Sequence, residues 1–371
     1  MKIGILTVPF NNNYGGFLQA YALKKVLNDM GHEVVFVNRQ REKSSSLKNR
    51  VYRFLVKLHI IKDFLAEHIR TISVNTDLFK STYLSPITPA YFSSDELKKC
   101  LELGIDLFIV GSDQVWRYEY AQDSIEDYFF GFIDDVSIPR ISYAASFGTD
   151  YLDYPTGLID KIKTLLSRFQ AISVREKSGQ ILLSSYFDVP ISKVYHVLDP
   201  TLLLSSEDYK YLFKSIQPND ERYVLTYILD KDMLNLKELS KLCGDYNINR
   251  VDISAQTGNY KSMKVLEPVE KWLSLICLAD YVVTDSFHGA VFSIIFHRPF
   301  IVLANPNRGL ERLQSLLTMI GLEDRLIPSN ELSISEAIKR EINWSNVEQK
   351  LNVYRVQSIA YLNHSIQLLH N

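Results

Sequence analysis

Short apolar runs alternate with longer amphipathic stretches along almost the whole chain. Such runs are typical of buried strands. In the first half they are Ile3–Val8, Glu33–Asn38, Asp106–Val110, Ile141–Ala145, Ala171–Val174 and Val194–Leu198. Phe17–Met30, which follows the first run, has the spacing of a helix, and Gly31 ends it. This alternation predicts a parallel sheet with helices on both faces.

The same alternation begins again after Asp199-Pro200-Thr201. The expected strands are Tyr223–Leu229, Arg250–Ile253, Tyr281–Thr284 and Phe300–Ala304, and the expected helices are Met233–Tyr246, Glu267–Ala279 and Gly289–Phe296. We therefore predict an α/β protein with two Rossmann-like domains of mostly parallel sheets that face each other across a cleft. The expected bounds are 1–200 and 201–330, followed by a helical tail, 331–371, that packs back across both domains.

The composition excludes several classes of protein. The 371 residues are 46% hydrophobic and 23% charged, which argues against a disordered chain. The net charge of -2 argues against a globally basic nucleic-acid binder. Three cysteines without a CxxC pair fit a reducing compartment. The chain contains no apolar run of about 18 residues and no signal-peptide pattern, so we expect a cytoplasmic protein.

One segment departs from this balance of charge. Arg39–Lys62 contains eight basic residues and one acidic residue, a net charge of +7, and its apolar residues recur at roughly helical spacing. One interpretation is a solvated helix whose apolar stripe packs on the protein body. The other is a basic amphipathic helix that contacts an anionic membrane surface.

Polar residues and glycines follow the first and third expected strands, at the edge where such folds bind ligands. Asn13, Gly15 and Gly16 precede a helix, where backbone amides can hold an anion or a sugar hydroxyl. A simple turn in which the glycines relieve strain fits equally well. Asp113 can accept a proton or orient a substrate hydroxyl, or it can cap the next helix.

Basic side chains follow three later strands. Arg175 presents a planar fork that suits phosphate or carboxylate, although an ion pair with Glu176 or another acid is the alternative. His288 lies in a turn before a helix that Gly289 opens, and it can transfer a proton or simply bind a backbone carbonyl. Together with Arg308, these side chains would form a cationic clamp for a small, doubly charged anion. No spacing typical of a metal site occurs.

Six segments, taken in order, resemble the polysaccharide pyruvyl transferase family over about residues 1–330. They are Asn13–Leu23, Gly111–Trp116, Ser142–Gly148, Ser173–Glu176, Asp199–Leu203 and Thr284–Gly289. The resemblance implies a fold like that of the GT-B glycosyltransferases. It also implies phosphoenolpyruvate as donor, a sugar as acceptor, a cyclic pyruvate ketal as product and the release of phosphate. The donor site of the family falls on His288, its neighbour Gly289 and Arg175, with Arg308 as a further basic residue.

The resemblance also implies an acceptor that is lipid-linked, and hence work at the inner face of the cytoplasmic membrane. No cofactor is expected, because the reaction has no redox step and needs no nicotinamide, and the reaction does not demand a metal. Strand-end placement assigns Asn13, Gly15, Gly16 and Asp113 to the acceptor side, with Asp113 as the base for a hydroxyl proton. Two alternatives stay open: a GT-B-type glycosyltransferase that uses a nucleotide sugar, and a non-catalytic carbohydrate-binding relative.

Overall fold

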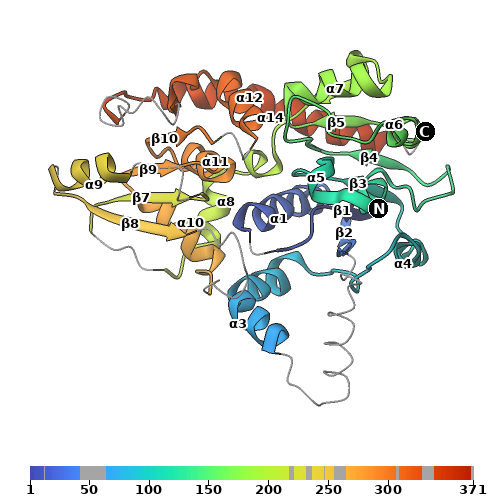
Figure 1. Cartoon of the computed structure of the whole chain (residues 1–371), viewed down its shortest axis with the longest axis horizontal. Helices are drawn as coiled ribbons and strands as arrows, with labels where there is room; N and C mark the ends of the chain where they lie inside the picture. The colour runs from blue at the N-terminus through green and yellow to red at the C-terminus, as the bar shows by residue number, and fades with distance from the viewer. Residues whose placement is uncertain are drawn as a thin grey trace.

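The computed structural model describes residues 1–11, 13–41, 64–216, 221–230, 236–245, 247–254, 265–305, 309–327 and 338–368. Over these residues the chain forms two parallel sheets that lie in separate halves of the molecule (Figure 1). The α/β class and the parallel pairing predicted from the sequence are confirmed.

The N-terminal sheet has the strand order β2-β1-β3-β4. Its strands are β1 (Lys2–Leu6), β2 (Glu33–Phe36), β3 (Leu107–Val110) and β4 (Arg140–Ser142). A further parallel pair, β5 (Ile172–Val174) and β6 (Val194–His196), joins β4 through bridges between Ile141 and Ala171 and between Ala145 and Val174. The strands from β2 to β6 therefore all run parallel to one another across a continuous surface.

The C-terminal sheet has the order β11-β10-β9-β7-β8. Its strands are β7 (Tyr223–Ile228), β8 (Asn249–Ser254), β9 (Tyr281–Thr284), β10 (Phe300–Leu303) and β11 (Leu326–Ile327). The short edge strand β11 was not expected from the sequence, since two residues are too few to show a periodic pattern.

Helices connect these strands. The α-helices are α1 (Tyr14–Asp29), α3 (Phe64–Phe79), α4 (Ser94–Leu97), α5 (Tyr118–Ala121), α6 (Thr156–Leu166), α7 (Lys177–Phe187), α8 (Ser206–Lys210), α9 (Leu236–Asp245), α10 (Val269–Leu278), α11 (Phe287–Ile295), α12 (Leu310–Ile320) and α14 (Trp344–Gln367). A π-helix forms at η1 (Lys80–Leu84). The 3-10 helices are η2 (Lys98–Leu103), η3 (Gln122–Phe129), η4 (Ile191–Lys193), η5 (Pro200–Leu203), η6 (Tyr211–Phe213) and η10 (Glu323–Arg325).

Two helices begin earlier than the apolar pattern suggests, because side chains cap them. Helix α1 begins at Tyr14, where the Asn13 side chain accepts a hydrogen bond from the Gly15 amide at 3.1 Å. Helix α11 begins at Phe287, with Ser286 as its cap. The expectation that His288 lies in a turn before the helix is therefore wrong, since it lies in the first turn of α11.

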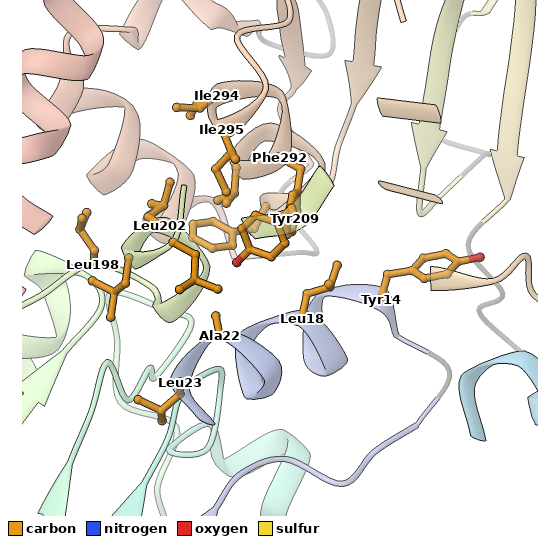
Figure 2. Close-up of a cluster of buried hydrophobic side chains, with 14 of the residues drawn as sticks. Tyr14, Leu18, Ala22, Leu23, Leu198, Leu202, Tyr209, Phe292, Ile294 and Ile295 are labelled. Carbon is orange, nitrogen blue, oxygen red and sulfur yellow. The ribbon is translucent and has the colours of Figure 1, made fainter. Parts of the chain in front are cut away.

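Helix α1 joins the two halves through an apolar cluster (Figure 2). In that view its side chains lie beside Leu198, Leu202 and Tyr209 from the connecting segment and beside residues of α11 such as Phe292. Tyr14 reaches furthest: its ring stacks on Trp272 at 5.1 Å, and its hydroxyl donates to the Glu267 carbonyl at 3.0 Å. The cluster is continuous and buried, so packing sets the placement of the two sheets.

Helix α14 also contacts both halves. The Tyr361 hydroxyl donates to the Ser142 carbonyl at 2.7 Å, and the Ser358 hydroxyl accepts from the Leu198 amide at 3.0 Å. The helix packs as well against α12 of the C-terminal half. Helix α14 therefore holds the segment that links the two sheets.

Residues 42–62 of the basic segment lie outside the described residues, so the solvated-helix and membrane interpretations both stay predictions. The prediction that the basic surface begins at Arg39 is wrong. Arg39 is buried, and its Nε donates to the Asp127 carboxylate at 2.7 Å, so its charge is matched inside the fold and not on a basic surface. Within the described ranges, none of the helices combines the length and apolar character that crossing a bilayer requires.

Candidate active site

A cavity of about 440 Å³ lies between the two halves, beyond the carboxyl ends of the strands. Both halves contribute to its wall. The lining residues that matter for chemistry are Asn13, Tyr14, Gly16, Arg39, Gln40, Arg41, Asp113, Tyr120, Tyr128, Asp285, Ser286, Phe287, His288 and Arg312. Cavities of this size suit small ligands, and in folds of this class they form at this edge of the sheets.

Asp113 lies on the loop after β3, in a strained backbone conformation. Its φ is 72°, a left-handed value that costs energy for a residue with a side chain. Its Oδ1 lies 3.1 Å from Arg175 Nη2 and 3.6 Å from Arg312 Nη1. Burial raises the pKa of the Asp113 carboxyl, but Arg175, His288 and Arg312 outweigh this and hold the pKa below its ordinary value. Asp113 is therefore an ionised carboxylate at neutral pH.

Arg175 is completely buried behind the cavity and is not among the residues of its wall. One arm of its guanidinium donates to Asp113, and the other donates to Asp199 Oδ2 at 2.5 Å. Burial alone would lower the pKa of Arg175, but the carboxylates of Asp199 and Asp113 raise it above its ordinary value. The guanidinium that we expected from the sequence to bind a ligand therefore binds two carboxylates of the protein.

His288 projects from the first turn of α11 and is 6% exposed. Its Nε2 lies 3.8 Å from Asp199 Oδ2 and is buried, with no hydrogen-bond partner among the residues that the structure describes. A Cβ atom on Gly15 would overlap Nδ1 of the ring, so the close approach of α1 requires glycine there. Burial lowers the pKa of His288, which leaves the imidazole neutral at pH 7.

Two functional candidates were missed by sequence reasoning. Arg312 lies in the first turn of α12, lines the cavity, and places its guanidinium carbon 5.4 Å from the centre of the Phe287 ring. Burial and the neighbouring charge of Arg175 lower the pKa of Arg312 to about 10. Asp199, the second partner of Arg175, marked only a boundary and a family segment in the sequence, although an Asp before Pro at a helix start signals a cap.

The remaining expected site residues differ in their position relative to the cavity. Asn13 and Gly16 line the cavity, and Gly15 lies against His288. Gly289 is not part of the cavity wall, and a Cβ there would overlap Thr284 Oγ1, so this glycine permits close packing of α11 on β9. Arg308 lies outside the described residues.

Opposite charges meet at the centre of the cluster. Two carboxylates, Asp113 and Asp199, face two guanidinium groups, Arg175 and Arg312, while His288 is neutral. The part of the chain that the structure describes contains no group of three or more His, Cys, Asp or Glu residues that could hold a metal ion. The geometry offers a neutral base, an ionised carboxylate and a cavity-facing cation within one small space.

Comparison with known proteins adds a family and a fold. A family model described as polysaccharide pyruvyl transferase matches residues 13–307, which is most of the chain. No curated protein matches the chain.

Several solved structures share the fold at low sequence identity. A complex of MnaA from S. aureus with UDP has a TM-score of 0.55 and 14% identity, covering 95% of this chain and 90% of that one. UDP-GlcNAc 2-epimerase from Methanocaldococcus jannaschii has a TM-score of 0.53 and 13% identity, covering 96% and 99%. The 2-epimerase from Neisseria meningitidis bound to UDP-GlcNAc has a TM-score of 0.50 and 12% identity, with full coverage of both chains. The predicted GT-B-like fold is confirmed.

Proposed function

Because the chain belongs to the polysaccharide pyruvyl transferase family, we propose a reaction for it that starts from this membership. The family makes it a transferase with a sugar or polysaccharide acceptor. It moves the pyruvyl unit of phosphoenolpyruvate onto two hydroxyls of a sugar, forms a cyclic ketal and releases phosphate. The sugar belongs to a polysaccharide precursor that is carried on a lipid, at the inner face of the cytoplasmic membrane.

One observation carries this proposal: His288, Asp113 and Arg312 line the same cavity between the two halves. Phosphoenolpyruvate carries a phosphate and a carboxylate, so it requires cationic partners. Arg312 supplies a guanidinium that faces the cavity, and protonated His288 supplies the second positive charge. We assign Arg175 to the layer behind, where it holds Asp113 in place, and Arg308 stays a predicted additional cation.

His288 supplies the acid and the base of the reaction. In the free protein burial lowers its pKa, and the negative charge of bound phosphoenolpyruvate raises it again. The protonated imidazole donates to the methylene carbon of phosphoenolpyruvate, and the adjacent carbon takes on cationic character. A sugar hydroxyl oxygen attacks that carbon, and its proton returns to His288.

The second half of the reaction closes the ring. The bond between carbon and the phosphate oxygen breaks, phosphate leaves, and a second hydroxyl of the sugar attacks the same carbon. The departing phosphate takes up the proton of that hydroxyl, so the atoms and charges balance without an oxidant or reductant. Asp113, as an ionised carboxylate with a lowered pKa, accepts a hydrogen bond from a sugar hydroxyl and orients it. Asn13 and Gly16 line the same cavity, and we assign them as contacts for the acceptor sugar.

The direct test is the release of inorganic phosphate from phosphoenolpyruvate in the presence of a panel of nitrophenyl and lipid-linked glycosides. Release that depends on a glycoside, and is lost in His288→Gln, supports the proposal. Binding of phosphoenolpyruvate without release for any member of the panel favours a non-catalytic carbohydrate-binding role.

A second candidate is a glycosyltransferase that uses a nucleotide sugar. The observation in its favour is that two similarly folded structures were solved with UDP or UDP-GlcNAc. Thermal shifts distinguish the two candidates: phosphoenolpyruvate should raise the melting temperature, whereas UDP-GlcNAc at the same concentration should not. The opposite result would favour the glycosyltransferase.

A further inference from the structure

We propose that Asp199 is the positioning residue for His288: its carboxylate accepts the Nε2 proton of the imidazole, so that Nδ1 is the nitrogen that transfers protons to and from the substrate. This inference rests on the proposed function only in giving His288 an acid-base role. The pairing of the two side chains is a property of the free protein.

The Asp199 carboxylate is held by donors on both oxygens. Oδ1 accepts from the Thr201 amide at 3.0 Å and from the Thr201 hydroxyl at 2.6 Å. Oδ2 accepts from Arg175 at 2.5 Å and from the Ser112 hydroxyl at 3.4 Å. With this many donors the group stays ionised, even though it is buried: burial raises the pKa of Asp199, while Arg175, His288 and Thr201 bring it below its ordinary value.

The same Oδ2 is also the carboxylate oxygen that contacts His288. Nε2 lies 3.8 Å from it, and this nitrogen is buried without a hydrogen-bond partner among the described residues. An orphaned buried N–H is costly, and a shift of less than 1 Å turns the 3.8 Å contact into a hydrogen bond. Catalytic hydrogen bonds are often long before the substrate binds and shorten in its complex.

The surroundings of the other nitrogen favour the same tautomer. Nδ1 lies against Gly15 in the first turn of α1, where the positive end of the helix dipole opposes a proton. The remaining charged groups that act on the ring are Asp113, Arg175 and Arg312. Neither arginine can accept a proton, and the carboxylate oxygen in contact with Nε2 is Asp199 Oδ2, at 3.8 Å. Asp199 is therefore the partner that selects protonated Nε2 and leaves Nδ1 as the base.

The loop that carries Asp199 is fixed from the far end of the chain. Helix α14 binds it on both sides: Ser358 accepts from the Leu198 amide at 3.0 Å, and Arg355 Nε donates to the Leu202 carbonyl at 2.9 Å. Tyr209 donates its hydroxyl to the Thr201 carbonyl at 2.9 Å. A carboxylate on so rigid a loop is suited to orienting a catalytic imidazole.

The first experiment measures the tautomer and the pKa of His288 by NMR in the full-length protein labelled with ¹⁵N-histidine, without substrate. His288→Gln assigns the signal among the eight histidines. We expect the neutral ring to carry its proton on Nε2, and Asp199→Asn to lower the pKa and reduce the Nε2-protonated population. Asp113→Asn is the matched comparison, because it removes the other carboxylate of Arg175 while leaving the acceptor of Nε2. It should preserve the tautomer.

The second experiment measures turnover of phosphoenolpyruvate as a function of pH. Asp199→Asn should lower kcat by roughly a hundred-fold or more, with little change in KM, and shift the limb of the profile that reports His288 to lower pH. If Asp199→Asn fails to fold, Thr201→Val removes one hydrogen bond that fixes the Asp199 carboxylate, and it should lower kcat by a smaller factor through loss of positioning.

The outcomes separate the two proposals. Protonation of Nδ1 in the wild type, or an unchanged tautomer and pKa in Asp199→Asn, would overturn the role of Asp199. If the wild type fails to use phosphoenolpyruvate while the NMR result holds, the pairing of Asp199 with His288 is supported and only the proposed reaction falls.

Discussion

Replacing Arg175 by lysine tests whether one guanidinium holds the centre of the site together. Its two arms bind Asp113 at 3.1 Å and Asp199 at 2.5 Å, and all three side chains are buried. Lysine keeps the charge but presents a single ammonium in place of a fork, so it replaces one of these contacts and loses the other.

A hydrogen bond between charged groups contributes about 1.5–3 kcal/mol, and burial removes the screening that weakens surface pairs. We therefore expect Arg175→Lys to reduce the free energy of unfolding by about 1.5–3 kcal/mol at pH 7, measured by urea titration with far-UV circular dichroism. The pKa values of Asp113 and Asp199 are lowered in the folded protein, so the stability that they contribute is present at neutral pH. It is lost as the pH falls below about 4, and the difference from the variant should narrow there.

Arg250→Lys is the matched control. Arg250 pairs with Asp252 at 2.9 Å through a pair that is partly exposed, so the same substitution should cost no more than about 1 kcal/mol. The reasoning fails if Arg175→Lys costs no more than this control, or if the cost does not narrow at low pH.

Four further predictions follow from the site. His288→Gln should abolish phosphate release while leaving the circular dichroism spectrum unchanged; near-normal turnover would exclude the acid-base role. Gly15→Ala places a methyl group on Nδ1 of His288 and should lower kcat roughly a hundred-fold, whereas Gly157→Ala, where a Cβ meets no atom within 4 Å, should not. The pKa of His288 lies below its ordinary 6.5 in the folded state, so the unfolded chain takes up the proton first as the pH drops. The free energy of unfolding should therefore fall below about pH 6.5. In thermal melts, His288→Gln should make this loss of stability with pH less steep. EDTA should leave turnover intact; loss that a divalent ion restores would contradict this.

The sequence by itself determined the class of the fold and the sheet edge at which the candidate site lies. Alternating strand and helix patterns report local burial, and parallel strands all end at one edge, so residues that follow strands, such as Asp113 and His288, are expected there. The same patterns placed most strands within a few residues of their observed bounds. They were less reliable at helix starts, because the caps at Asn13 and Ser286 depend on single hydrogen bonds.

Only the tertiary structure decided which charges meet. Arg175 pairs with Asp113, 62 residues away, and with Asp199, 24 residues away, instead of facing a ligand. Arg312 enters the cavity from a helix, outside the strand-end pattern, and Arg39 is buried against Asp127 instead of joining a basic surface. Periodicity carries no information about such pairs. Their partners are set by how helices pack against two separate sheets, and each buried charge is then stable only beside the opposite charge that this packing supplies.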